Sequence, residues 1–168
     1  LKLFCSGLGT EHPDITNASR RIKSKEVNKC AENGVEDITE IKVGYDGIAL
    51  ANSKSGPSLK LSLKEVYLAL AKVVPADPEG ETVKPNPYKM WNEINPSLPA
   101  KPIVVIGPPP TSGTRDAFNE LAIERGCKKF PGRKELKKAN KKLYKAECRG
   151  LREDGAYVEA GENDNLII

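Results

Sequence analysis

The chain has 168 residues, which is enough to bury one hydrophobic core and a little more. Hydrophobic residues make up 38% and charged residues 30% of it, which fits a globular protein. No apolar run reaches the ~20 residues that cross a bilayer, so a membrane-spanning chain is excluded. The net charge of +4 is mild and suits an anionic ligand. An initiating Met and a signal peptide are both missing, which indicates a processed or partial chain.

The N-terminal part predicts a helix that follows a short strand and a polar turn. Lys2–Cys5 is typical of the end of a helix, and Asp14–Ala18 predicts a strand. Ser24 is the predicted N-cap of a helix over Lys25–Glu32. Just before it, Ser19-Arg20 places a hydroxyl beside a guanidinium, either to hold an anion or as an ordinary exposed turn.

Two β segments are predicted at Ile38–Tyr45 and Gly47–Asn52, on either side of Asp46. They form either a tight hairpin or one long bent strand that carries the chain from one lobe to another. A capping box at Ser62–Glu65 then begins a helix that ends before Pro75.

The C-terminal part alternates strands with helices, which predicts a parallel-rich α/β sheet. In such sheets ligands bind at the carboxyl ends of the strands. The predicted elements are a loop over Pro75–Pro87, a short helix over Pro87–Ile94, a strand at Ile103–Ile106, a helix over Arg115–Arg125, a break at Phe130–Gly132, one or two cationic helices over Leu136–Cys148, a loop into a helix at Leu151–Glu159, and the start of a strand at Asn165–Ile168.

The loop between the Ile103–Ile106 strand and the next helix ends in Ser112-Gly113-Thr114-Arg115. The first amide groups of a helix have no internal partner and attract negative charge. Gly113 lets the backbone approach a ligand, while Ser112 and Thr114 add hydroxyl donors. Arg115 adds a planar cationic fork. The pattern predicts a site for a tetrahedral oxyanion, phosphate first; the alternative is a hydroxyl that only caps the helix.

The four cysteines form no Cys-x-x-Cys pair, and with a single His, His12, they give poor support to a zinc site. Their even number and wide spacing favour two disulfides in an oxidising compartment, with four reduced buried thiols as the alternative. Chain order offers Cys5–Cys30 with Cys127–Cys148 as the local pairing, although four cysteines allow three connectivities.

Lysines concentrate between Lys128 and Lys145. A nucleic-acid or membrane-surface patch is one interpretation of this segment. Its two aromatic residues, Phe130 and Tyr144, are not interleaved with the cations as base stacking requires. A solvated helical face is the favoured interpretation.

Four motifs follow one another along nearly the whole chain: Pro13–Ile22, Gly44–Ala51, Trp91–Pro96 and Ser112–Phe118. Together they resemble the phosphate-binding subunit of bacterial ABC-type phosphate importers. The resemblance implies an α/β fold like that of type II periplasmic binding proteins, with two lobes that close over one dehydrated phosphate. It assigns residues 1–46 to part of the first lobe and 47–168 to the second. The family's first phosphate loop and the C-terminal completion of its fold are absent, so the chain resembles an internal fragment.

Carried over residue by residue, the resemblance implies phosphate binding by Ser19 and Arg20 of the first lobe and by Ser112, Gly113, Thr114 and Arg115 of the second. Some members place an Asp directly after the first-lobe Ser and an Arg four residues before Ser-Gly-Thr. Here those positions hold Arg20 and Pro108. We therefore expect Arg115 to supply the positive charge from the other side.

Monohydrogen phosphate carries a proton that needs an acceptor, whereas sulfate carries none. A carboxylate in the site would therefore reject sulfate, because a buried unsatisfied group is costly. Asp14, Asp46 and Asp116 are the candidates for this acceptor within the chain, and the alternative is an acceptor in the segments that are missing relative to the family.

The predicted function is reversible capture of inorganic phosphate for an ABC importer, with no catalytic residue, metal or cofactor. The expected partners are phosphate and the ABC permease in the membrane, with no nucleic acid. We expect a monomer in the periplasm or exported to the cell surface.

One alternative is a phosphoryl- or sulfuryl-transfer enzyme that uses the same turns and has a metal or general base near Ser112. Others are a binder of a related oxyanion such as sulfate, and an adhesive or nucleic-acid-binding surface on Lys128–Lys145. No nucleophile–base pair is expected, because His12 is predicted to be a loop residue that stands alone.

Overall fold

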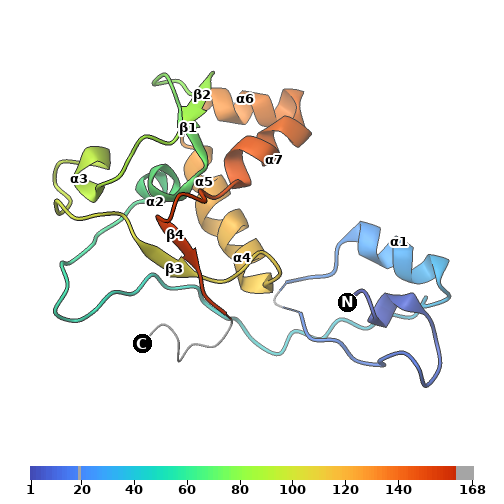
Figure 1. Cartoon of the computed structure of the whole chain (residues 1–168). Coiled ribbons are helices and arrows are strands. Elements are labelled where there is room, and N and C mark those ends of the chain that lie inside the picture. The colour runs from blue at the N-terminus through green and yellow to red at the C-terminus, as the bar shows by residue number, and fades with distance from the viewer. Residues whose placement is uncertain (19, 162–168) are drawn as a thin grey trace. The chain divides into compact units, whose positions relative to one another are not determined.

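The structure is a computed structural model that describes residues 1–18 and 20–161. The chain divides into two compact units, Leu1–Ala49 and Leu50–Ile168, which are described one at a time (Figure 1). The assignment of residues 1–46 and 47–168 to two lobes stays a prediction. No helix within the described ranges is long and apolar enough to span a bilayer.

The first unit is built around the Cys5–Cys30 disulfide, which confirms one half of the predicted pairing. The 3₁₀ turn η1 (Phe4–Ser6) and the helix α1 (Ser24–Glu32) each carry one cysteine, and the two Cα atoms are 4.2 Å apart. Together with Val35 these cysteines are the buried core described for this unit. So small a core needs a covalent cross-link to be stable.

The N-cap of α1 is Lys23, one residue earlier than the predicted Ser24. The carboxylate of Glu26, in the first turn, accepts a hydrogen bond of 2.8 Å from the Lys23 amide. This carboxylate satisfies a donor outside the helix, so the helix begins without a hydroxyl cap.

The strands predicted at residues 14–18 and 38–52 are wrong, since no strand forms over these residues of the described chain. Alternating apolar residues form a strand only when a neighbouring strand pairs with them and a packed layer covers one face. Val43 is 98% exposed and Tyr45 is 92% exposed, so this segment has neither.

The second unit is organised around the helix α2 (Leu63–Leu70). Its start confirms the predicted capping box: the Glu65 amide donates to Ser62 Oγ, and the Ser62 amide donates to the Glu65 carboxylate at 2.7 Å. Tyr67 and Leu70 of α2 are fully buried. The helix packs against α5 (Glu124–Cys127). A Cβ at Gly126 would lie 2.0 Å from the Leu63 carbonyl, so only glycine permits this close approach.

The strands form two small sheets and not the single parallel-rich sheet that was predicted. β1 (Val73–Pro75) and β2 (Val83–Pro85) pair antiparallel. β1 replaces the end of the helix that was predicted to run up to Pro75, and β2 lies within the stretch expected to be loop. β3 (Val105–Gly107) and β4 (Tyr157–Glu159) pair parallel, with Gly107 opposite Glu159. The segment Leu151–Glu159 was expected to lead into a helix, and it ends instead in β4 because its aromatic residue Tyr157 is buried against the core.

The helices of the second unit largely follow the predicted positions. The short helix α3 is Trp91–Ile94. A continuous helical segment comprises α4 (Gly113–Phe118), a π-helical turn at Asn119–Ile123, and α5. The cationic segment forms two helices, α6 (Pro131–Ala139) and α7 (Lys141–Arg149), which pack against each other (Figure 1). Pro131 does not break the chain as predicted but starts α6, where its missing N–H costs nothing.

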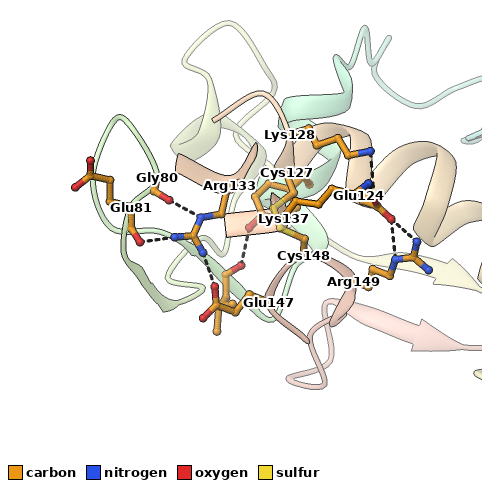
Figure 2. The surroundings of a disulfide bond; sticks show 12 residues. Gly80, Glu81, Glu124, Cys127, Lys128, Arg133, Lys137, Glu147, Cys148 and Arg149 are labelled. Atoms are coloured by element: carbon orange, nitrogen blue, oxygen red, sulfur yellow. Dashed lines mark hydrogen bonds and ion pairs between the residues drawn. A yellow bond between two sulfur atoms is a disulfide. The ribbon is translucent and has the colours of Figure 1, made fainter. Parts of the chain in front are cut away.

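The second disulfide, Cys127–Cys148, joins α5 to α7 and confirms the other half of the predicted pairing. Beside it lies Glu124, whose side chain is only 5% exposed and is surrounded by cations (Figure 2). It accepts bonds from Lys137 at 2.9 Å and from Arg149 Nε at 2.7 Å, and it pairs with Lys128 at 3.1 Å. Burial raises the pKa of Glu124, but these cations outweigh burial and lower it to about 2.

Arg133 fastens α6 to its surroundings in a similar way. Its buried guanidinium donates to the carbonyls of Gly80 and Glu81 and to the carboxylate of Glu147 on α7 (Figure 2). One side chain therefore joins α6 to the β1–β2 connection and to α7, and the Glu147 carboxylate balances its charge.

We expect Glu124→Gln to lower the free energy of unfolding at pH 7 by about 3 kcal/mol, because three cations lose the carboxylate that neutralises them. The folded-state pKa of Glu124 lies below its unfolded value. Its contribution is therefore complete above about pH 4.5 and is lost as the pH falls towards about 2. Wild type should lose this stability over that window, and the variant should not.

Urea unfolding followed by the fluorescence of Trp91, the only tryptophan, measures both effects in the unit that contains Glu124. Glu153→Gln is the matched control, since Glu153 is exposed and its ion pair among the described residues is with Lys72 at the surface. Equal losses in the two variants would contradict a special role for the Glu124 cluster.

Candidate oxyanion-binding site

The predicted strand, loop and helix around Ser112 are confirmed. β3 ends at Gly107, the proline-rich loop follows, and Ser112 is the N-cap of α4. Ser112 Oγ accepts a hydrogen bond of 3.1 Å from the Thr114 amide, and Ser112 is buried. The ordinary capping role therefore exists, and it leaves the hydroxyl proton of Ser112 available to a ligand.

The first turn of α4 presents main-chain donors at the surface. Gly113 and Thr114 are exposed. As first-turn residues, Gly113 and Arg115 have amide groups without an acceptor inside the helix. The helical path continues through the π-turn and α5 to Cys127, so the dipoles of several turns favour an anion at this end.

Arg115 points into the protein and not into solvent. Its side chain is 10% exposed, and Nη1 donates a hydrogen bond of 2.8 Å to the Pro108 carbonyl. The guanidinium carbon lies 4.3 Å from the ring centre of Tyr157, and Nη2 lies 3.7 Å from a carboxylate oxygen of Glu159. These contacts fix the orientation of the guanidinium.

Tyr157 locks the loop to β4. Its hydroxyl donates a hydrogen bond of 3.0 Å to the same Pro108 carbonyl that Arg115 uses. Burial raises the pKa of Tyr157, although the nearby Arg115 acts in the opposite direction. A Cβ at Gly107 would lie 2.3 Å from the Tyr157 hydroxyl, so glycine is required where β3 runs into the loop.

Sequence reasoning missed Tyr157 and Glu159. Both lie more than forty residues after Arg115 and reach it only because β4 pairs in parallel with β3. A local signal was present: Tyr157-Val158-Glu159 follows Asp154-Gly155, a turn dipeptide, and Gly155 has a φ of 91°.

The first-lobe residues belong to the other unit and are described separately. Ser19 lies outside the described residues. Arg20 donates to both carboxylate oxygens of Glu26, at 2.9 and 2.7 Å, and this bidentate bond is the main cause that lowers the pKa of Glu26 to about 2. A site that combines Ser19 and Arg20 with Ser112–Arg115 stays a prediction.

The three acidic residues predicted as proton acceptors, Asp14, Asp46 and Asp116, are all exposed. Asp46 accepts a hydrogen bond from the amide of Gly47, the next residue. Asp116 lies in the first turn of α4, next to Arg115. The carboxylate that pairs with Arg115 is Glu159, which the sequence analysis did not consider.

His12 does not stand alone as predicted, because its Nδ1 lies 3.0 Å from Ser6 Oγ. Ser6 uses its only hydroxyl proton in a bond of 2.6 Å to the Leu3 carbonyl. The imidazole must then be the donor in its contact with Ser6, which is the opposite of what a general base requires. The described part of the chain contains no cluster of three or more His, Cys, Asp or Glu side chains arranged to hold a metal ion.

Comparison with known proteins places the chain in one protein family. The sequence model of a family described as "PBP superfamily domain" matches residues 1–167. The chain is 35% identical to Protein SphX of Synechococcus elongatus over 124 residues, which cover 74% of this chain and 32% of that protein. It is 30% identical to the phosphate-binding protein PstS of Staphylococcus saprophyticus over 117 residues, which cover 67% and 31%.

The chain therefore spans about a third of the length of the curated relatives it matches. No solved structure matches it significantly. The resemblance to phosphate-binding proteins drawn from four motifs is confirmed by these relatives, and the mixture of helices and strands agrees with the α/β fold of periplasmic binding proteins. Because the family model covers all but the last residue, this chain belongs to the PBP superfamily.

Proposed function

We propose that this chain is part of a solute-binding protein that captures inorganic phosphate for an ABC importer and catalyses no reaction. The relatives named as phosphate-binding proteins support the ligand. In this proposal the fold is of type II, residues 1–46 belong to the first lobe and 47–168 to the second. The protein is a monomer in the periplasm or at the cell surface and delivers phosphate to a membrane permease.

One observation carries the proposal: the start of α4 combines unpaired main-chain donors with a buried, immobilised guanidinium. Arg115 is held by Pro108, Tyr157 and Glu159 before any ligand arrives. Little side-chain entropy remains to be lost on binding, so the charge–charge contact contributes more of its energy to affinity. A planar fork and a helix N-terminus are both suited to the oxygens of a tetrahedral anion.

Glu159 gives this half-site a means of choosing among oxyanions. Its carboxylate is 47% exposed and lies beside Arg115 at the carboxyl end of β4. The P–OH group of monohydrogen phosphate could donate a hydrogen bond to this carboxylate. Sulfate has no proton to donate, so its oxygens would be repelled by the carboxylate without a hydrogen bond to offset the repulsion. We therefore add Glu159 to the three Asp candidates for the proton acceptor.

In the complete protein, Arg115→Ala should weaken phosphate binding by about 100-fold, because a charged hydrogen-bonding partner is removed. Ser112→Asp separates the two roles of Ser112, since Asp is as good an N-cap as Ser but places a negative charge against the anion. We expect this variant to fold normally and to lose phosphate binding in calorimetry.

Lys60→Ala, which removes an exposed lysine of the same unit, is the control and should bind as wild type does. If Ser112→Asp bound phosphate with wild-type affinity, the anion would not lie at the start of α4.

Glu159→Gln should reduce the preference for phosphate over sulfate at least about tenfold, because an amide can donate to sulfate and carries no charge. Competition calorimetry with the two anions measures the ratio. An unchanged ratio would assign the acceptor role to another carboxylate. Asp116→Asn, measured in parallel, would show whether that carboxylate is Asp116.

The complete protein should release no product from an aryl phosphate ester, with or without added divalent metal, because within the described residues Ser112 Oγ is hydrogen-bonded to the Thr114 amide and not to a general base. Turnover that disappears in Ser112→Asp would show that the same turn serves phosphoryl transfer, and it would replace the binding-protein assignment.

A further inference from the structure

Positive charge is concentrated in one part of the second unit. Residues 124–149 contain eleven Lys and Arg and three Glu, a net charge of +8, while the whole chain carries only +4. The remaining residues therefore have a net charge of −4. This segment comprises α5, the following turn, α6 and α7.

About half of these cations are neutralised inside the unit. Glu124 forms ion pairs with Lys128, Lys137 and Arg149, as Figure 2 shows. Arg133 is bound to Glu147 and to two carbonyls, and Lys138 pairs with Glu135. Both arginines of α6 and α7 thus have their guanidinium groups engaged within the protein.

The other cations of the turn and the two helices form what we call the lysine face. All are exposed, and within the described chain none has an acidic partner; they are Lys129, Lys134, Lys141, Lys142 and Lys145. On α7 the side chains of Tyr144 and Cys148 are buried, whereas Leu143 and Ala146 are exposed. The disulfide and the Arg133–Glu147 pair hold the two helices in place, so this face is formed in advance.

We propose that the lysine face docks the protein on the surface of an anionic lipid bilayer. Lysine ammonium groups act as point charges that a field of acidic headgroups attracts without specific geometry.

A nucleic acid fits this surface less well. The aromatic residues of the segment, Phe130 and Tyr144, are buried and cannot stack on bases. Arg133 and Arg149 of α6 and α7, which could form bidentate bonds with phosphodiesters, are engaged within the protein. Arg125 of α5 is the exposed arginine that remains in this described segment. The inference goes beyond phosphate capture and does not depend on it.

Co-sedimentation of the complete protein with vesicles tests this proposal. Wild type should bind phosphatidylcholine vesicles that contain about 30 mol% phosphatidylglycerol but not phosphatidylcholine alone. Binding should fall steeply between about 50 and about 300 mM salt, since the attraction is screened. Equal binding to both vesicles would overturn the proposal.

The triple variant Lys141→Gln, Lys142→Gln, Lys145→Gln should lower the partition coefficient about 100-fold, at about fivefold per lysine. The matched control removes three exposed lysines elsewhere in the same unit, Lys54→Gln, Lys60→Gln, Lys84→Gln, and should change it less than about threefold. Replacing the three α7 lysines by Arg should preserve binding. Equal losses in the two Gln triples would show that only net charge matters and would overturn the docking face.

Two further measurements make the outcome unambiguous. Trp91 fluorescence and phosphate calorimetry should be unchanged in the α7 triple variant, which separates loss of docking from loss of folding or of the oxyanion site. Retention of wild type on duplex DNA, combined with no binding to anionic vesicles, would assign the face to nucleic acid and overturn the proposal.

Discussion

The Pro108 carbonyl is the point on which the arrangement of the site depends. It accepts a hydrogen bond from Arg115, seven residues later, and another from Tyr157, forty-nine residues later. One acceptor thereby joins the loop after β3, the start of α4 and the start of β4. A proline-rich loop suits this role because its backbone is stiff and its proline residues have no N–H groups to satisfy.

Buried charge is the second feature that holds the larger unit together. Glu124, Arg133 and Arg152 are all buried, and each is matched. Arg152 donates to the carbonyls of Ala69 and Tyr88 and pairs with Asp154. Such groups contribute little net stability when complete, but removing one partner leaves a charge without solvent or counter-ion. They therefore specify which helix packs where, and the disulfide at Cys127–Cys148 fixes the same helices covalently.

The distribution of charge separates the two anion-binding proposals for the second unit. At the start of α4 a single guanidinium is buried, oriented and paired, which is suited to a small anion held at close range. On α6 and α7 several lysines are exposed and have no acidic partner within the described chain, which is suited to an extended surface charge. Cations of one sequence therefore suit two different ligands: a buried cation suits a small anion, and exposed cations suit a charged surface.

The sequence by itself determined the features that depend on neighbouring residues. The capping box at Ser62, the strand, loop and helix around Ser112 and the helical character of the cationic segment follow from short-range patterns. Chain order offered the local disulfide pairing as one of three connectivities, and the structure confirms it. Four ordered motifs were enough to identify the family.

Only the tertiary structure decided what depends on residues far apart in the chain. The strands predicted between residues 38 and 52 do not form, because a strand needs a partner that local sequence does not specify. Glu159 and Tyr157 contact Arg115 because β3 pairs in parallel with β4. The positions of Glu124, Glu135 and Glu147 decide which cations of α6 and α7 are paired and which are exposed without an acidic partner in the described chain. Contacts of this kind depend on chain closure and on long-range packing, and neither is encoded in any local pattern of residues.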